Sequence, residues 1–473
     1  MVKNKENLFG IVLLLILSLI FAIIPQGANK FLIWFCLIYF YIIFFNSISK
    51  PISIVRGIKT YIKIDTFFYL SFYLIFYYPY QLYVLGLESL DTVKFLSYEE
   101  YTNKAILLST IALLAFRLGF NYYKENKTQK VFHVISKKYM NILTFIIFLF
   151  ISLILLLFVN TGASTLFSGA YIGSKMGSVT FDAIFSLVTF FIILGSLQSI
   201  SYYSIHRKIN VLTFIISIIS IVWAGALLFV GDRNTFFLVG LVIASGIFTY
   251  IKSVSRLTLL VLSFLSLFLY QVIEISRISE TRDLDSFLDA ASMAINGQGE
   301  ENGKKSSLNT TTTGLRATFK IMEEQDFYYG KFKLVSIASI VPYSSRLFVD
   351  SNDRMTGSTN VLNKEMIGLD RTWSVGTNII SDSYLDFGLM GVLIIMFYFG
   401  RFGGYVKLMA QKHINSPKWM YIYIITLSYY SEIVRYGFDF PLRSIIWTFL
   451  LFFVINTVAG LASKNSKYKI NNE

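Results

Sequence analysis

Long apolar runs recur along the whole chain and constrain its fold more than any other feature of the sequence. A helix needs roughly 20 apolar residues to cross the hydrocarbon core of a bilayer, and inside that core its backbone must satisfy its own hydrogen bonds. Short polar connections separate the runs, as expected between spans. They predict about twelve transmembrane helices, at residues 8–24, 31–46, 66–85, 105–123, 140–160, 180–203, 209–229, 235–251, 257–275, 379–400, 418–434 and 443–462.

Composition excludes the main soluble classes. The 473 residues are 55% hydrophobic and only 15% charged, whereas soluble domains are about 25% charged. The single cysteine, Cys36, lies inside an apolar run, so the sequence predicts neither a disulfide framework nor a thiolate metal site. Three scattered histidines do not suggest a metal cluster. We therefore expect an all-α polytopic membrane protein without a metal or another cofactor.

The basic residues predict how the helices are oriented. If the N-terminus is cytoplasmic, the cytoplasmic segments contain 23 Lys and Arg residues and the short outer connections contain 7. Basic residues are retained in cytoplasmic loops, so this difference predicts that both termini are cytoplasmic. The net charge of +14 is then explained by topology and by contact with anionic lipid, and nucleic acid is not an expected partner.

One connection is much longer than the others. Residues 276–378 join the ninth and tenth predicted helices on the outer side and divide the chain into segments 1–275, 276–378 and 379–473. Within the connection we expect a short amphipathic helix at 283–294, a mobile low-complexity tip at 296–313 and a second helix at 315–324. Connections of this length are usually functional or disordered, and this one has enough apolar residues to fold partly against the membrane.

Arginines on the predicted outer side have no topological explanation. A guanidinium stays charged and binds phosphate oxygens in pairs, so the set predicts an anionic ligand. Alternatively, each arginine reaches the membrane interface or pairs with a neighbour, as Arg233 could with Asp232 and Arg435 with Asp439. The candidate residues for the anionic ligand are Arg233, Arg277, Arg282, Arg371, Arg435 and Arg443.

Carboxylates near the outer ends of the predicted helices are the candidate catalytic groups. Glu274, Asp382 and Asp386 lie where an uncompensated carboxylate is costly and often functional. Asp382 and Asp386 are four residues apart and should share one helix face. Either Glu274 or Asp382 could act as a general base, and the sequence does not choose between them. The pair Asp283 and Asp285 is a weaker candidate, for a divalent cation.

The segment around the start of the tenth helix resembles a known family pattern. Bacterial O-antigen ligases and polymerases carry His, then Asn, Ser or Gln, nine residues, Gly, two residues and a small residue after their large periplasmic loop. Asn378, Gly388 and Gly391 match this spacing, and Thr377 occupies the His position. The turn at 231–233 is similar to the small-x-Arg turn of the same families. With its overall layout, the chain most resembles the oligosaccharide repeat-unit polymerases (Wzy type).

This resemblance implies a membrane-embedded glycosyltransferase of the bacterial inner (cytoplasmic) membrane, with its active face outward. Its substrates would be oligosaccharides of O-antigen, capsule or a related polysaccharide linked to undecaprenyl diphosphate, and a chain-length regulator protein is a further expected partner. The candidate arginines and Asn378 would bind diphosphate and glycan without a metal, and positioned donors would stabilise the leaving diphosphate.

Three other classes stay open. An O-antigen ligase shares the layout, although Thr377 in place of His weighs against it. A flippase or transporter for lipid-linked oligosaccharides would need basic residues inside its spans, and these spans are almost free of Lys and Arg. A non-catalytic membrane sensor or scaffold is the third alternative.

Overall fold

The computed structural model describes most of the chain. The described residues are 2–55, 58–90, 98–123, 130–162, 179–230, 232–276, 284–295, 307–341, 344, 357–368, 374–463 and 469–472.

Helices dominate this part of the chain, as the apolar runs predict. In chain order they are α1 (Val2–Ile23), α2 (Lys30–Ser49), α3 (Ile64–Phe76), α4 (Tyr78–Val84), α5 (Thr102–Phe120), α6 (Lys137–Gly162), α8 (Val179–His206), α9 (Val211–Val230), α10 (Arg233–Tyr250), α11 (Arg256–Ser276), α12 (Leu284–Ile295), α13 (Ser307–Glu324), α14 (Lys331–Ala338), α15 (Ser358–Met366), α16 (Ile379–Lys412), α17 (Pro417–Glu432) and α18 (Asp439–Ala462). Single 3-10 turns lie at Glu99–Tyr101 and Ile433–Arg435.

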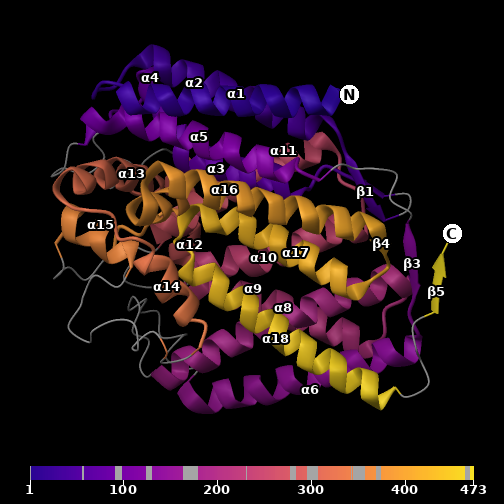
Figure 1. The fold of residues 1–473 in the computed structure, drawn as a ribbon. Helices are drawn as coiled ribbons and strands as arrows, with labels where there is room; N and C mark the ends of the chain where they lie inside the picture. The colour runs from indigo at the N-terminus through magenta and orange to yellow at the C-terminus, as the bar shows by residue number, and fades with distance from the viewer. Residues whose placement is uncertain are drawn as a thin grey trace.

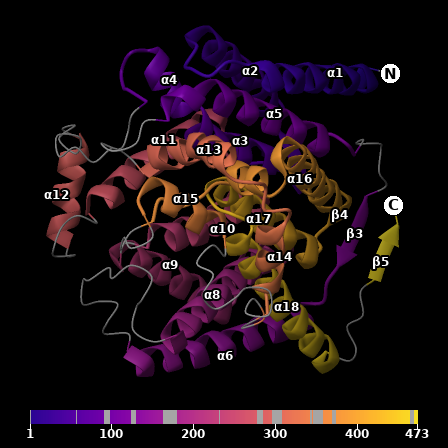
Figure 2. The same cartoon turned by 60° about the vertical axis from the view of Figure 1, so that its left-hand side comes forward.

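The long helices lie side by side in one bundle, with α1 and α2 along one side and α6 along the opposite side (Figures 1 and 2). Helices α4, α13, α14 and α15 gather at one end of the bundle, which we call the α13 end. The strands lie at the other end, which we call the strand end, and both termini are found there (Figure 1). Helix α12 packs on α11 at the edge of the bundle (Figure 2).

Six helices in the described part of the chain are long and apolar enough to cross a membrane. They lie at Lys30–Ser49, Glu99–Phe120, Lys137–Thr161, Ala183–His206, Ile379–Lys412 and Leu442–Ala462. Four shorter apolar helices lie at Leu8–Ile23, Ile64–Phe76, Val211–Leu227 and Asn234–Tyr250. The all-α, membrane-type architecture is therefore confirmed, whereas the count of twelve spans stays a prediction.

The prediction of a single helix at 66–85 is wrong, because two helices occupy this segment. The chain leaves helical geometry at Tyr77, where φ is −126° and ψ is −37°, and a separate helix α4 begins at Tyr78. Pro79 lies in the first turn of α4, where its missing N–H costs nothing. Inside a continuous helix the same proline would remove one hydrogen bond and clash with the preceding turn. The apolar run continues through the break and therefore conceals it.

Helices α5 and α16 pack closer than any side chain would allow. A Cβ on Gly119 would lie 1.9 Å from the carbonyl oxygen of Phe397, and one on Gly400 would lie 2.0 Å from that of Phe116. Gly404 approaches α5 almost as closely. Small residues at helix crossings let backbones meet in this way in membranes. Residues of both helices are widely buried.

The prediction of a mobile tip at 296–313 is wrong for its second part, which belongs to helix α13. Residues 296–306 of that tip lie outside the described residues, but Ser307–Glu324 forms one helix. Its threonines at 311–313 are buried rather than at a mobile tip. The hydroxyl of Thr312 donates to the carbonyl oxygen of Ile75 in α3, so a polar sequence is held inside the protein by hydrogen bonds. The predicted helix at 283–294 is present as α12.

Two small sheets close the strand end. Strands β1 (Ile52–Val55) and β2 (Ile58–Thr60) pair antiparallel, and β3 (Val131–Val134) lies between β4 (His413–Ile414) and β5 (Lys469–Asn472). Nε2 of His133 and Nδ1 of His413 lie 3.1 Å apart across β3 and β4. Burial lowers the pKa of both imidazoles, and for His413 the charges of His133, Lys412 and Lys418 lower it further.

Candidate functional site

The site begins where the chain enters α16 at the α13 end. Asn378 is the N-cap of that helix, and its Oδ1 accepts from the backbone N–H of Ser381 at 2.8 Å. Its Nδ2 donates to the carbonyl oxygen of Thr311 in α13 at 3.3 Å. Asn378 is fully buried, so both polar atoms of its amide group are engaged within the protein. This residue therefore ties the long connection to the start of the helix.

The structure explains why glycine occupies positions 388 and 391 of the family-like pattern: the first by its backbone conformation, the second by close packing. Gly388 has φ +60° and ψ −151°, a region that essentially only glycine occupies, and it interrupts the helical geometry of α16. A Cβ there would also lie 2.9 Å from the ring of Phe327. Three residues later, a Cβ on Gly391 would lie 2.7 Å from the carbonyl oxygen of Ser383. The spacing Asn378, Gly388, Gly391 thus encodes a capped and kinked first segment of α16.

The two aspartates of this segment share one cation. Nζ of Lys333, from α14, forms an ion pair with Oδ2 of Asp382 and another with Oδ2 of Asp386, the second at 3.3 Å. Lys333 also donates from Nζ to the backbone carbonyl of Asp382 at 2.9 Å. The carboxylate of Asp386 accepts the backbone N–H groups of Phe332 and Lys333, both at 3.2 Å. Helix α14 is therefore fixed to α16 by its first turn.

Two hydroxyl groups extend this cluster towards the N-cap. Ser358, at the start of α15, donates to Oδ1 of Asp382 at 2.6 Å and lies 3.1 Å from the hydroxyl of Thr377. We refer to Lys333, Ser358, Thr377, Asp382 and Asp386 as the carboxylate cluster. Asp382 is 3% exposed and Asp386 is 0% exposed.

The cluster has the parts of a proton-handling site. Two carboxyl groups face one ammonium within it, and both carboxyl groups are buried. Such clusters are costly in the low dielectric of a protein interior unless they are well hydrogen-bonded. The row from Thr377 through Ser358 to Asp382 could pass a proton between a bound hydroxyl and the carboxylate.

The turn before α18 borders the cluster. Nζ of Lys333 lies 5.2 Å from the ring centre of Phe438, which gives its charge a cation–π contact. Arg435, one of the predicted phosphate-binding residues, ends the 3-10 turn just before this phenylalanine and is half-buried. Arg443 lies in the first turns of α18 and is exposed.

The other predicted residues are described only partly or not at all. Arg277, Arg282 and Arg371 lie outside the described residues. Arg233 begins α10 and Glu274 lies in the last turns of α11, but neither side chain is described. The convergence of the six arginines therefore stays a prediction.

Asp232 does have a described role. It is the N-cap of α10, and its carboxylate accepts from the backbone N–H of Thr235 at 3.2 Å and from the hydroxyl of Thr235 at 2.7 Å. Asp285, from the weaker cation-site prediction, lies in the first turn of α12, and Asp283 lies outside the described residues.

Sequence reasoning missed Lys333 and Ser358. Lys333 is 49 residues from Asp382 along the chain, and nothing in its neighbourhood distinguishes it from other lysines of the connection. The available signal was the pair of aspartates at i and i+4, since two buried carboxylates on one face require a cation.

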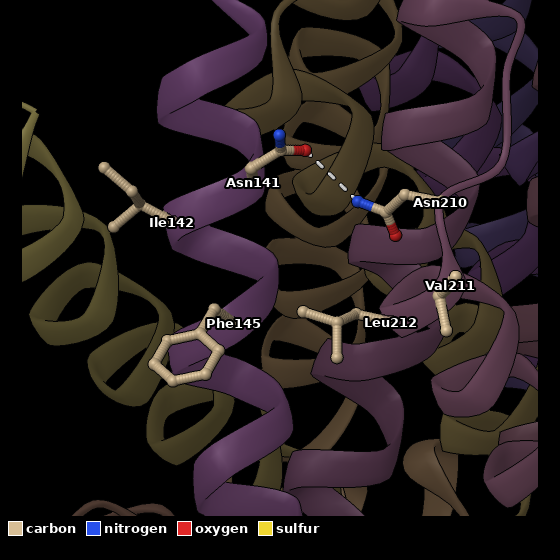
Figure 3. Close-up of a pocket in the computed structure, with 6 residues that line it drawn as sticks. All are labelled: Asn141, Ile142, Phe145, Asn210, Val211 and Leu212. Atoms are coloured by element: carbon tan, nitrogen blue, oxygen red, sulfur yellow. Dashed lines mark hydrogen bonds between the residues drawn. The ribbon is translucent and has the colours of Figure 1, made fainter.

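A shallow hollow at the strand end is a poorer candidate. It is lined by the first turns of α6 and α9, including Ile142, Phe145 and Leu212 (Figure 3). Its polar contact is Asn210, whose Nδ2 donates to Oδ1 of Asn141 at 3.1 Å. None of its lining residues is acidic or basic, so it offers neither a base nor a charge for a phosphate.

Comparisons of the chain with protein-family models, with curated proteins and with solved structures found no match. The carboxylate cluster and the residue pattern around Asn378 are therefore the features that bear on function.

Proposed function

We propose that this protein is a membrane-embedded glycosyltransferase that polymerises oligosaccharide repeat units linked to undecaprenyl diphosphate. In this proposal about twelve helices span the bacterial cytoplasmic membrane. The strand end, with both termini, faces the cytoplasm, and the α13 end faces outward. The product is O-antigen, capsule or a related surface polysaccharide, and a chain-length regulator protein is an expected partner.

The observation that carries the proposal is the position of the carboxylate cluster. It lies where the long connection meets the first segment of α16, on the residue pattern that resembles the polymerases and ligases. A buried acidic pair with one lysine and two hydroxyls at the end of a membrane-type bundle is more than helix packing requires. An acceptor sugar reaching this end from the outer leaflet would meet a general base there.

The proposed reaction is a single displacement. A hydroxyl oxygen of the acceptor repeat unit attacks the anomeric carbon of the donor glycan. The new C–O bond forms as the bond between that carbon and the diphosphate oxygen breaks, and undecaprenyl diphosphate leaves with the bonding electron pair. The proton of the hydroxyl passes to a carboxylate, for which Asp382 and Glu274 are the candidates.

The arginines have a separate role in this proposal. Guanidinium groups among Arg233, Arg277, Arg282, Arg371, Arg435 and Arg443 would bind the two lipid diphosphates and stabilise the charge that develops on the leaving group. Asn378, whose side chain is engaged with α13 and α16, would act by holding the entry of α16 in place.

Complementation of a deletion strain tests the proposal. Asp382→Asn removes the base while keeping the size of the side chain, so we expect a surface that carries single repeat units and no ladder of longer glycans. Glu274→Gln tests the other candidate in the same way. Asp326→Asn is the matched control because Asp326 is an exposed carboxylate of the same connection. Full ladders from both Asp382→Asn and Glu274→Gln, at matched protein levels, would refute a carboxylate base.

A reaction with purified components separates polymerase from the alternatives. With lipid-linked repeat units as the only substrate and excess chelator present, we expect polymer to form. Transfer of finished glycan to a second acceptor, without polymer, would identify a ligase, and movement of intact substrate across a vesicle membrane would identify a flippase. Strict dependence on Mg²⁺ or Mn²⁺ would contradict the role proposed for the arginines.

A further inference from the structure

Arg316 is a fully buried arginine whose charge is not compensated within the described part of the chain. It lies in the middle of α13 and is 2% exposed. One terminal nitrogen, Nη2, donates to the carbonyl oxygen of Leu90 at 2.8 Å and to the hydroxyl of Thr313 at 3.0 Å. Its Nε and Nη1 atoms are buried and have no acceptor among the described residues. None of the ion pairs between described residues includes Arg316.

A second unpartnered donor lies in α4, a helix that contacts α13. Tyr80 in α4 is 0% exposed, and its hydroxyl is buried without a hydrogen-bond partner in the described part of the chain. The guanidinium of Arg316 interacts electrostatically with this phenol. Two helices that contact each other therefore carry buried N–H and O–H donors for which the described residues supply no acceptor.

The surrounding helices hold Arg316 in this location. Residues 311–319 of α13 are all buried, and the helix packs against α3, α5, α15 and α16. Thr312 donates to Ile75, and Thr311 accepts from Asn378 at the start of α16. The guanidinium cannot turn towards water without breaking its bonds to Leu90 and Thr313 and shifting this helix.

The missing partner must be an acceptor with negative charge. A guanidinium does not deprotonate in proteins, so its charge cannot be removed by a proton shift. Burying an unpaired charge is much costlier than burying an unpaired neutral group, and a neutral acceptor would leave that cost in place. A metal cation is excluded by the charge already present. An oxyanion supplies the charge and several acceptor oxygens in one group.

We propose that Arg316 and Tyr80 form a buried binding site for an oxyanion, either a carboxylate or a phosphate. Its oxygens accept from Nε and Nη1 of Arg316 and from the hydroxyl of Tyr80. The site is separate from the carboxylate cluster and does not depend on the proposed function. Because Thr311 of the same helix is bonded to Asn378, an anion bound here also stabilises the start of α16.

Anion-dependent unfolding of the purified full-length protein tests the site. The unfolding midpoint is measured in detergent micelles against sodium phosphate, sodium glucuronate and sodium chloride at constant ionic strength. A ligand that binds only the folded protein raises the midpoint with its concentration. We expect a saturable rise with phosphate or glucuronate and none with chloride. A rise with glucuronate alone identifies a carboxylate site, as an acidic sugar would need, and a rise with phosphate alone identifies a phosphate site.

Variants separate binding at this site from general salt effects, since phosphate also stabilises proteins by exclusion from their surface. Arg316→Met removes the charge and keeps most of the length of the side chain. It should abolish the saturable response and should raise the midpoint in the absence of anion, because no unpaired charge remains. Tyr80→Phe removes one donor, so about tenfold more anion should be needed for the same shift. Lys320→Gln, in the same helix, is the control and should keep the full response.

Two results would overturn the proposal. One is an equal anion response in the wild type and in Arg316→Met. If Arg316→Met does not fold, an anion response of Tyr80→Phe equal to that of the wild type has the same meaning. The other concerns Asp91, which follows Leu90 in the sequence and lies outside the described residues. If the wild type shows no anion response and Asp91→Asn creates one, the partner of Arg316 is internal and the site is not a ligand site.

Discussion

Replacing Gly400 or Gly119 by alanine should separate helices α5 and α16. The new Cβ of Gly400→Ala would lie 2.0 Å from the carbonyl oxygen of Phe116, and that of Gly119→Ala would lie 1.9 Å from that of Phe397. Real Cβ atoms essentially never approach another atom closer than 3.0 Å, so α5 and α16 must move apart by about 1 Å. The obstacle is backbone in both cases and cannot rotate away.

The structure sets the size of the effect. A gap of 0.5–1 Å removes roughly a quarter to a half of the dispersion energy of each contact along the crossing. Overpacking usually costs about 1–3 kcal/mol, and we expect about 3 kcal/mol for each variant because a backbone obstacle places it at the upper end. Gly240→Ala in α10 is the matched control, since its Cβ would meet nothing within 4 Å. It should be neutral or slightly stabilising through helix propensity.

The assay is unfolding by SDS titration in mixed micelles, followed by circular dichroism. We expect the midpoints of Gly119→Ala and Gly400→Ala to fall well below that of the wild type, while Gly240→Ala stays at or above it. Equal midpoints for Gly400→Ala and Gly240→Ala would refute the close backbone contact between α5 and α16.

Three further predictions use the same unfolding assay. Gly388→Ala places a side chain at φ +60° and should cost about 1–3 kcal/mol, whereas Gly357→Ala, at φ −152°, should change little. Lys333→Met leaves the carboxylate cluster without its cation and should cost about 3–5 kcal/mol, part of which a second change, Asp382→Asn, should restore. Because the folded protein lowers the pKa of His133 and His413, the unfolded chain binds more protons near pH 6. Stability should therefore fall as the pH drops below about 6.5, and His133→Asn/His413→Asn should weaken this dependence.

The sequence is a good guide to helices and a poor guide to their ends. Apolar runs of membrane length predict most of the long helices because burial in lipid or protein requires little more than composition. The break at Tyr77 is hidden, since the run stays apolar through it. The buried threonines of α13 are hidden for the opposite reason. Their sequence is polar, and only contacts with distant residues such as Ile75 show that it can be buried.

The candidate site was predictable only where its residues are close in sequence. The spacing of Asp382 and Asp386 places both on one face of α16, and both contact the same ammonium. That ammonium comes from Lys333 in another helix. Arg316 likewise interacts electrostatically with Tyr80, in a helix more than two hundred positions earlier. Such pairs depend on how residues 276–378 fold back on the bundle, and no local sequence pattern predicts this.

The close crossing of α5 and α16 has a consequence for how the protein is made. Helix α5 leaves the ribosome more than 250 residues before its partner, yet 83% of its most apolar window is buried in the finished bundle. Until α16 is inserted, the face of α5 around Gly119 lacks the backbone that it contacts in the finished bundle, and it faces lipid or a transient partner. Chains that stop before Ile379 therefore leave the Gly119 face of α5 without its partner helix in the membrane, a feature by which proteases that clear incomplete membrane proteins could recognise them.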